Sequence, residues 1–306
     1  MPTINVNDAY VLNETGAEVD KVTGLFTKNE NATTGEKQMA RLNIAAGGSN
    51  PNLLDNAYFV GGGSQLGDGV FPINQRGQSS YTGGGTQLDR WKTWEANDVI
   101  TLTANGVKFK SPNGNGMFQY WSEFPTTKTV TFSAIIDGNI YSVTLPEGDT
   151  QYDYIGTGFK IGISRNGKCV YIKSQNTEIL IAACKLEVGT VSTLANDPPP
   201  DFGEELAKCK RRLRYVPLKR TPVILDGGYS VAVVTLTGIE MASSPTASLI
   251  TAGTAYAYNP LTSATPTSAS VIAFDYNTPT IQLGLNAALN GIGVVYDTVI
   301  QLSCEL

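Results

Sequence analysis

The residues of this chain best suited to bind a ligand are aromatic side chains placed next to hydrogen-bonding groups. Asp89, Arg90 and Trp91 are consecutive. In one interpretation Trp91 stacks on a pyranose ring while the Asp89 carboxylate accepts hydrogen bonds from its hydroxyls. In the alternative, Arg90 pairs with a carboxylate and Trp91 fills a core. The structural alternative is the stronger one, because large aromatic residues in packed strands are mostly buried.

A second aromatic group follows in the run Met117-Phe118-Gln119-Tyr120-Trp121. Tyr120 and Trp121 lie on opposite faces of a strand, so only one of them can face a core. The outward one can serve as a platform for a ligand or pack against a loop, and Trp94 is a similar candidate. The candidate ligand-binding residues are Asp89, Trp91, Trp94, Tyr120 and Trp121.

The chain contains no histidine, which removes the commonest general base and metal ligand. Ser-His-Asp and Cys-His triads and HExxH zinc sites are therefore excluded. A glycosidase with paired carboxylates needs only Asp and Glu, and Glu147, Asp149 and Asp153 offer such pairs. They lie in a turn rich in Pro, Gly and Asp, where acids shape loops. We expect no catalytic residue, no cofactor and no enzyme activity.

The glycine-rich loop and two aspartates are candidates for a phosphate site or a metal site. The glycine-rich stretch 61–69 has no Lys after its glycines and is no P-loop. Asp55 and Asp68 could contribute oxygen ligands to calcium, but the sequence has no ligand spacing to support that site. A plain loop is the stronger interpretation, and we expect no metal site.

The composition indicates the fold class, and the charge distribution limits the possible partners of the protein. Hydrophobic residues make up 41% of the 306 residues and charged residues only 16%, and the abundance of Gly, Thr, Ser and Asn favours turn-rich β-structure. The segment 204–220 holds seven basic and two acidic residues, but no Lys or Arg follows Arg220. Because gripping a phosphate backbone needs cations, nucleic acid is an improbable partner. The basic run is better explained as the solvated end of a helix.

No apolar run approaches the ~20 residues that a bilayer crossing needs, and the N-terminal sequence has no pattern of a secretory signal. We expect no membrane insertion. Cysteines stand at positions 169, 184, 209 and 304, outside any CxxC pair. The spacing favours buried small hydrophobes in a reducing cytoplasm over disulfides.

Alternating apolar residues predict an antiparallel β-domain over residues 50–196. Three pairs of strand-like runs flank the turn sequences Asn105-Gly106, Asp137-Gly138 and Asn166-Gly167, which supply positive φ between paired strands. One face of each strand is apolar, as in Val130, Phe132, Ala134 and Ile136. Two packed sheets, in a sandwich or jelly roll, follow from that pattern.

The remaining segments complete a mainly β chain. Residues 1–49 predict an attachment segment with a short helix near 35–46, and residues 197–216 predict a Pro-rich linker and a helix with Leu206, Cys209 and Leu213 on one stripe. Residues 217–306 predict a second small β-sandwich of five or six strands. Its charge-poor surface suits a domain buried in a homo-oligomer.

Several motifs resemble one family in particular. The stretches 52–59 (NLLDNAYF), 73–77 (INQRG) and 89–91 (DRW) resemble the opening of a jelly-roll module of tail-fibre and appendage proteins of phages and prophages of gut Firmicutes. The stretch 183–190 (ACKLEVGT) is similar to the end of such modules, and 35–44 resembles the helical repeat upstream of phage fibre domains. The resemblance covers roughly residues 33–215.

The resemblance implies a carbohydrate-binding-type jelly roll in a homotrimeric virion fibre made in a bacterial cytoplasm. The leading hypothesis is a tail-fibre or receptor-binding protein that contacts a host-surface glycan. A structural virion component, such as a head fibre or capsid decoration protein, is the alternative, and residues 1–49 would dock onto other virion proteins in either case. A depolymerising tailspike enzyme is the third and weakest.

Overall fold

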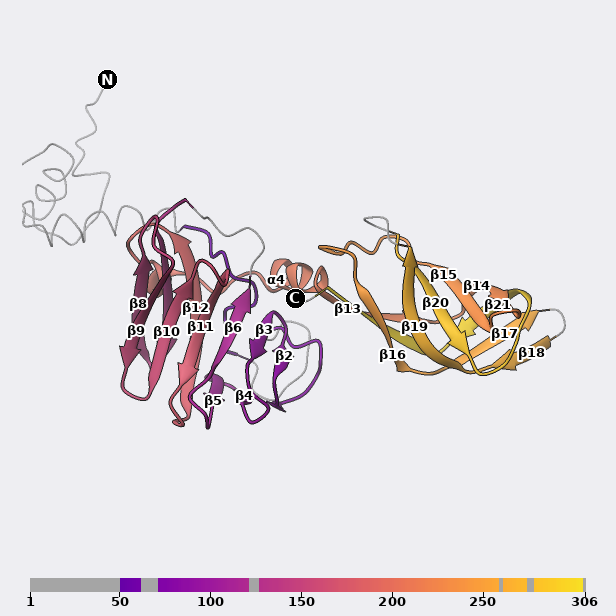
Figure 1. Cartoon of the computed structure of the whole chain (residues 1–306), viewed down its shortest axis with the longest axis horizontal. Helices are drawn as coiled ribbons and strands as arrows, with labels where there is room; N and C mark the ends of the chain where they lie inside the picture. Colours follow the sequence, from indigo (N-terminus) through magenta and orange to yellow (C-terminus); the bar gives the residue numbers. More distant parts are fainter. Residues whose placement is uncertain (1–49, 62–70, 121–126, 259–260, 274–277, 305–306) are drawn as a thin grey trace, which may run out of the picture. The chain divides into compact units, whose positions relative to one another are not determined.

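The computed structural model describes residues 50–61, 71–120, 127–258, 261–273 and 278–304 (Figure 1). The attachment segment 1–49 and its predicted helix lie outside the described residues. The described strands all belong to one unit of the chain, Asn52–Leu194 with Pro198–Leu306. The described part of this unit is mainly β, as the sequence predicts.

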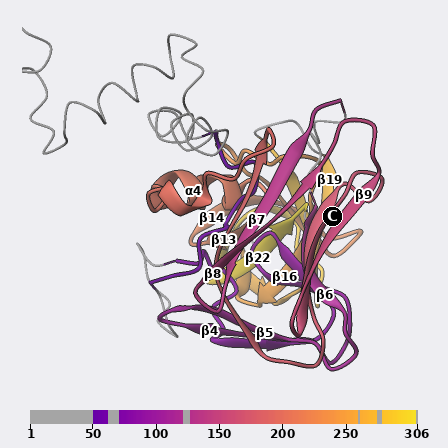
Figure 2. The same cartoon turned by 90° about the vertical axis from the view of Figure 1, so that its left-hand side faces the viewer.

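Two antiparallel sheets, named A and B, form a first β-sandwich in the described residues. Figure 2 separates the layer that holds β7 (Val130–Ile136) and β8 (Asn139–Leu145) from the layer that holds β6 (Gly116–Tyr120) and β9 (Gln151–Gly156). Sheet A has the order β1 (Ser80–Thr82), β4 (Val99–Thr103), β5 (Gly106–Lys110), β12 (Ile179–Val188), β7 (Val130–Ile136) and β8 (Asn139–Leu145). Sheet B has the order β2 (Gly85–Leu88), β3 (Trp91–Thr93), β6 (Gly116–Tyr120), β11 (Cys169–Ser174), β10 (Phe159–Ser164) and β9 (Gln151–Gly156).

The three hairpins predicted from turn residues are present. They join β4 to β5, β7 to β8, and β10 to β11. At the middle one, Asp137 and Gly138 have φ of 49° and 78°, the pair of positive values that a two-residue hairpin turn requires. The Asp137 carboxylate also accepts a hydrogen bond from the Leu180 amide at 3.0 Å, so this turn is tied to β12.

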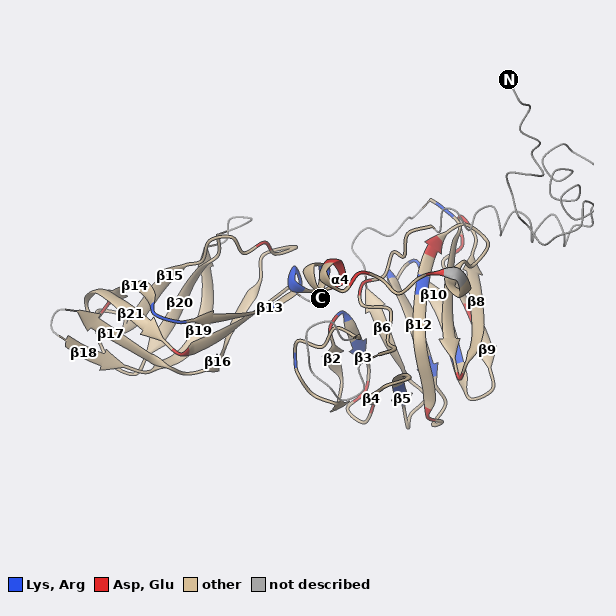
Figure 3. Ribbon diagram, turned by 180° about the vertical axis from the view of Figure 1, so that it is seen from behind, with Lys and Arg blue, Asp and Glu red and all other residues tan. Residues whose placement is uncertain are grey.

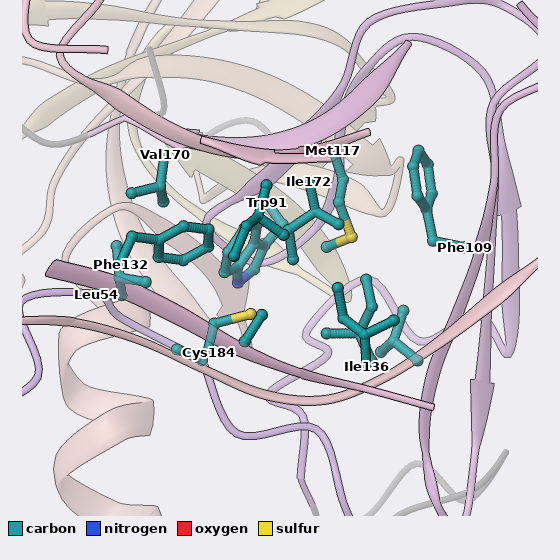
Figure 4. Close-up of a cluster of buried hydrophobic side chains, with 14 of the residues drawn as sticks. Leu54, Trp91, Phe109, Met117, Phe132, Ile136, Val170, Ile172 and Cys184 are labelled. Carbon is teal, nitrogen blue, oxygen red and sulfur yellow. The ribbon is translucent and has the colours of Figure 1, made fainter. Parts of the chain in front are cut away.

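The core of the first sandwich lies between sheets A and B and centres on Trp91 (Figure 4). The predicted inward face of β7 is correct, because its four alternating apolar residues all belong to the core cluster of the first sandwich. The same alternation buries Phe159, Ile161 and Ile163 on β10. Periodicity alone therefore identified which side of these strands faces the core.

Helix α4 (Phe202–Lys210) follows the short 3₁₀ turn η1 (Leu194–Asn196) and the Pro-rich linker. Asp201 caps it by accepting a hydrogen bond from the Glu204 amide at 2.9 Å. Glutamates occupy its first turn and lysines its last, which matches the helix dipole as predicted.

The predicted helical stripe is wrong at Leu213, where strand β13 (Leu213–Leu218) begins. The Arg212 amide donates to the Cys209 carbonyl at 2.9 Å and closes the last turn. Leu213 then pairs with Ser303 on β22. Cross-strand pairing of a run that contains Tyr, Val and Pro outweighs its helical spacing.

The second sandwich is built from β13 onward around a separate hydrophobic core (Figure 1). Sheet C has the order β13, β22 (Thr298–Ser303) and β16 (Thr246–Thr251). Sheet D has the order β18 (Leu261–Ala264), β17 (Thr254–Tyr258), β21 (Gly291–Tyr296), β14 (Thr221–Asp226), β15 (Val231–Thr235), β20 (Thr280–Leu285) and β19 (Pro266–Ala273).

The predicted number of five or six strands in this region is wrong, since the described residues from 213 onward form ten. Two apolar runs, each predicted to be one strand, are two strands in the structure. Asp297, at φ 50°, separates β21 from β22, and two residues ending in Gly253 separate β16 from β17. Breaks this short are missed when the end of a strand is predicted only from a cluster of turn residues.

All four cysteines are free and buried, as the sequence predicts. Burial raises the pKa of Cys169 to about 11, so very little thiolate is present at neutral pH. We expect a thiol reagent at pH 8 to label the native protein slowly and all four positions rapidly in urea. Mass spectrometry of labelled protein would check this, and rapid labelling without urea would contradict it.

Candidate functional site

Two of the predicted ligand-binding residues lie inside the first sandwich. Trp91 is completely buried, and its indole nitrogen donates to the Asn56 carbonyl at 2.9 Å. Asp89 is 1% exposed and accepts hydrogen bonds from the Gln75 amide at 2.6 Å and from Arg76 at 3.0 Å. Neither side chain is placed to meet a ligand. Their burial removes both from the set of candidate binding residues.

The alternative interpretation of this motif is the one that the geometry matches. Arg90, at φ 73°, pairs its largely buried guanidinium with the Asp55 carboxylate at 2.9 Å. Its other branch donates to the Tyr120 carbonyl at 3.1 Å. Since Arg90 engages Asp55, that carboxylate is a structural partner of the motif.

Asn56 connects the same motif residues to helix α4. Its side-chain amide donates to the Ile73 and Asp89 carbonyls at 2.8 and 2.9 Å, and its oxygen accepts from the Ile73 amide at 2.7 Å. The Asn56 backbone amide donates to Glu205 of α4 at 2.8 Å. Cys209 of α4 packs beside Ile73. The stretches 52–59, 73–77 and 89–91 therefore meet in one largely buried hydrogen-bonded network beside α4.

The other described candidates, Trp94 and Tyr120, lie together on the outer face of sheet B. The rings of Trp94 and Phe118 are 4.3 Å apart between centroids, and those of Phe118 and Tyr120 are 5.0 Å apart. Phe118 stands opposite Tyr171 on β11, which places a fourth ring on this face. Trp94 is 47% exposed. We name Trp94, Phe118, Tyr120 and Tyr171 the aromatic face.

Lysine side chains border the aromatic face. The Lys92 ammonium lies 5.8 Å from the centroid of Tyr120. The Lys173 ammonium lies 5.7 Å from the centroid of Trp94 and 5.3 Å from that of Tyr171. These separations are within the range of cation–π attraction. Phe118 and Tyr171 are only 5% and 4% exposed, so Trp94 is the most exposed ring of this face, with the Lys173 ammonium beside it.

Polar groups extend the face across β9 and β10. The Tyr171 hydroxyl donates to Asp153, which also pairs with Lys160 at 3.0 Å, and Gln151 donates to the Tyr171 hydroxyl at 2.9 Å. Gly162 makes room for this arrangement, because a Cβ there would overlap both the Tyr171 ring and the Asp153 carboxylate. Glycine at this position of β10 therefore lets the Tyr171 ring lie across the strand.

The ionisation of these groups follows from their contacts. Burial opposes ionisation of Asp153, but the hydrogen bonds from Tyr171 and Lys160 outweigh it and lower its pKa. Burial, helped by the hydrogen bond to Asp153, raises the pKa of Tyr171, and burial raises that of Tyr120. At neutral pH Asp153 is therefore an acceptor and both phenols keep their protons.

Hydrogen bonds to a buried carboxylate hold the backbone of Trp94 in place. The buried Asp98 carboxylate accepts hydrogen bonds from the Trp94 and Glu95 amides at 3.0 and 2.9 Å. Glu95 in turn accepts from the Asn115 side chain at 2.8 Å. The turn after β3 thus holds Trp94 in place without using its ring, which remains available on the surface.

The sequence analysis named Trp94 and Tyr120 as candidates but not Phe118 and Tyr171, which the structure places beside them. Trp121 and Asp68 lie outside the described residues. Of the acidic pairs, Asp153 belongs to the outer face of sheet B, whereas Asp149 lies in the turn before β9, where its carbonyl accepts from Arg165 at 2.7 Å.

In the part of the chain that the structure describes, no cluster of His, Cys, Asp and Glu could hold a metal ion. The same part contains no helix with the length and apolarity that a bilayer crossing requires. Models of known protein families do not match this chain, and neither do curated proteins.

Proposed function

We propose that this protein is a non-enzymatic virion fibre protein of the tail-fibre or receptor-binding type, whose first sandwich binds a host-surface glycan on the aromatic face. The observation that carries the proposal is the joining of exposed Trp94 to Tyr120 through Phe118 on one sheet face. The rings suit stacking on pyranoses, and Lys92 and Lys173 add donors for hydroxyl or acidic groups. Several copies on one particle would raise avidity without a strong single contact.

Substitution of Trp94 tests this proposal directly. We expect Trp94→Ala to weaken binding to host cell-wall polysaccharide roughly tenfold or more, because an aromatic at the centre of a contact often contributes more than about 1.4 kcal/mol. Binding would be measured by glycan array and by calorimetry on purified polysaccharide. Tyr229→Ala is the matched control, since Tyr229 is 80% exposed but lies in the second sandwich.

Equal binding by the Trp94→Ala and wild-type proteins would overturn the assignment of the site. The same samples test the absence of enzyme activity, because a depolymerising tailspike would release reducing sugar during the incubation. Release that stops on an Asp153→Asn change would replace the binding proposal with a catalytic one.

A structural virion component, such as a head fibre or decoration protein, is the second candidate. It is favoured by the exposed apolar residues of the second sandwich, which suit assembly better than glycan binding. Imaging of particles labelled on this protein separates the two. Density projecting from the head would eliminate the tail-fibre version, and density at the tail would eliminate the head version.

A further inference from the structure

Four large apolar side chains form a row across neighbouring strands of sheet D. Ile224 on β14 stands opposite Ile292 on β21, and Tyr258 on β17 stands opposite Leu261 on β18. Ala257 is opposite Gly293, so the same register brings Tyr258 beside Ile292. The four side chains are exposed by 68%, 69%, 61% and 78% in the order Ile224, Ile292, Tyr258 and Leu261.

A second row runs parallel to the first on the same face. Tyr256 stands opposite both Ser263 and Val294, and Val294 stands opposite Pro222. The Tyr256 ring also contacts Tyr296 edge-on at 5.6 Å. All of these side chains are uncharged. We name the two rows, residues 222, 224, 256, 258, 261, 263, 292 and 294, the apolar rows.

The size of this surface approaches that of a protein interface. Taking about 200 Å² for a fully exposed large side chain, the four exposed members of the first row present roughly 550 Å². That is near the upper end for the largest apolar patch of a typical monomer, about 300–600 Å². A stable complex buries about 800 Å² on each partner, so this patch would supply most of one side.

The lack of charge on the apolar rows, together with their area, fits a second copy of the same chain as the occupant. No Lys or Arg follows Arg220, whereas five acidic residues do, and Figure 3 shows the second sandwich almost without charged residues. Two acidic domains repel each other wherever their carboxylates meet, and the uncharged apolar rows are a face on which identical copies can meet without that repulsion. We propose that the apolar rows of sheet D are the surface through which copies of this protein associate.

The test is the mass of the full chain in solution. We expect light scattering and sedimentation to give a multiple of 32.6 kDa for the wild type, and the double variant Ile224→Lys/Ile292→Lys to associate at least roughly a hundredfold more weakly. Ile272→Lys is the matched control, because Ile272 is 51% exposed on β19 of the same sheet but outside the apolar rows. It should keep the wild-type mass.

Thermal unfolding would show whether the lysine variant is folded. If it is not, Ile224→Thr/Ile292→Thr replaces it, because threonine keeps the β-branched shape that strands prefer. A monomeric wild type at tens of micromolar, or a folded double variant of unchanged mass, would overturn the proposal. The outcome is independent of the glycan proposal, since Trp94→Ala should change glycan binding and leave the mass unchanged.

Discussion

Trp91→Ala should destabilise the first sandwich by about 3–5 kcal/mol, the range for removing a large aromatic from a core. Trp91 is completely buried, packs edge-on against Phe59 at 5.6 Å, and gives the Asn56 carbonyl a hydrogen-bond donor. The substitution therefore leaves a cavity and an unsatisfied acceptor in the same place. Urea unfolding followed by tryptophan fluorescence would measure the loss.

Fluorescence is well suited here because the three tryptophans of the chain stand at positions 91, 94 and 121, and none lies in the sequence of the second sandwich. Trp94→Ala is the matched control and should cost about 1 kcal/mol or less, since its ring is half exposed. Trp91→Ala should therefore lose stability, whereas Trp94→Ala should lose ligand binding and keep most of its stability. A Trp91→Ala protein as stable as the wild type would refute the placement of this ring.

Glu187→Gln should cost about 3–5 kcal/mol, because it removes the charge partner of a buried lysine. Lys185 and Glu187 are both completely buried on β12, with ammonium and carboxylate 3.8 Å apart. Thr193 joins them, since its hydroxyl accepts from Lys185 at 2.6 Å and donates to Glu187 at 2.9 Å. The midpoint of urea unfolding would measure the change.

The matched control is Glu178→Gln, because Glu178 pairs with Lys108 at 2.6 Å while both side chains are about half exposed. That change should cost less than about 1 kcal/mol. The double variant Lys185→Met/Glu187→Gln should recover part of the loss, because it removes the unpaired buried charge. Equal effects of Glu187→Gln and Glu178→Gln would contradict the buried pair.

The sequence predicted the first sandwich well because its signals are local. Turn residues with positive φ, such as Asp137 and Gly138, placed the hairpins, and alternation placed the inward faces. The second sandwich was harder. The single residue Asp297 divides one apolar run into two strands. Counting each apolar run as one strand therefore predicts too few strands.

The candidate site was only half predictable, and the reason lies in the strands that carry it. Met117 and Phe118 are adjacent and both buried, one in the core and the other on the outer face of sheet B. Tyr171 and Ile172 divide in the same way. Where both faces of a strand are apolar, alternation cannot say which residue points outward. That assignment requires the register between β6 and β11, which depends on the whole sheet.

The bond from Asn56 to Glu205 spans 149 positions of the chain, and this separation bears on how the protein is made. Asn56 and Ile73 are synthesised early. The Asn56 amide and the Ile73 side chain gain their partners on α4 only after that helix has been synthesised. Synthesis at about 5–20 residues per second puts roughly 7–30 seconds between the two events. Strand β12 lies between β5 and β7 in sheet A and ends at Val188, so the sandwich itself forms late in this interval, shortly before α4 is complete at Lys210. The opening motif therefore remains without these partners while most of the domain is still being synthesised.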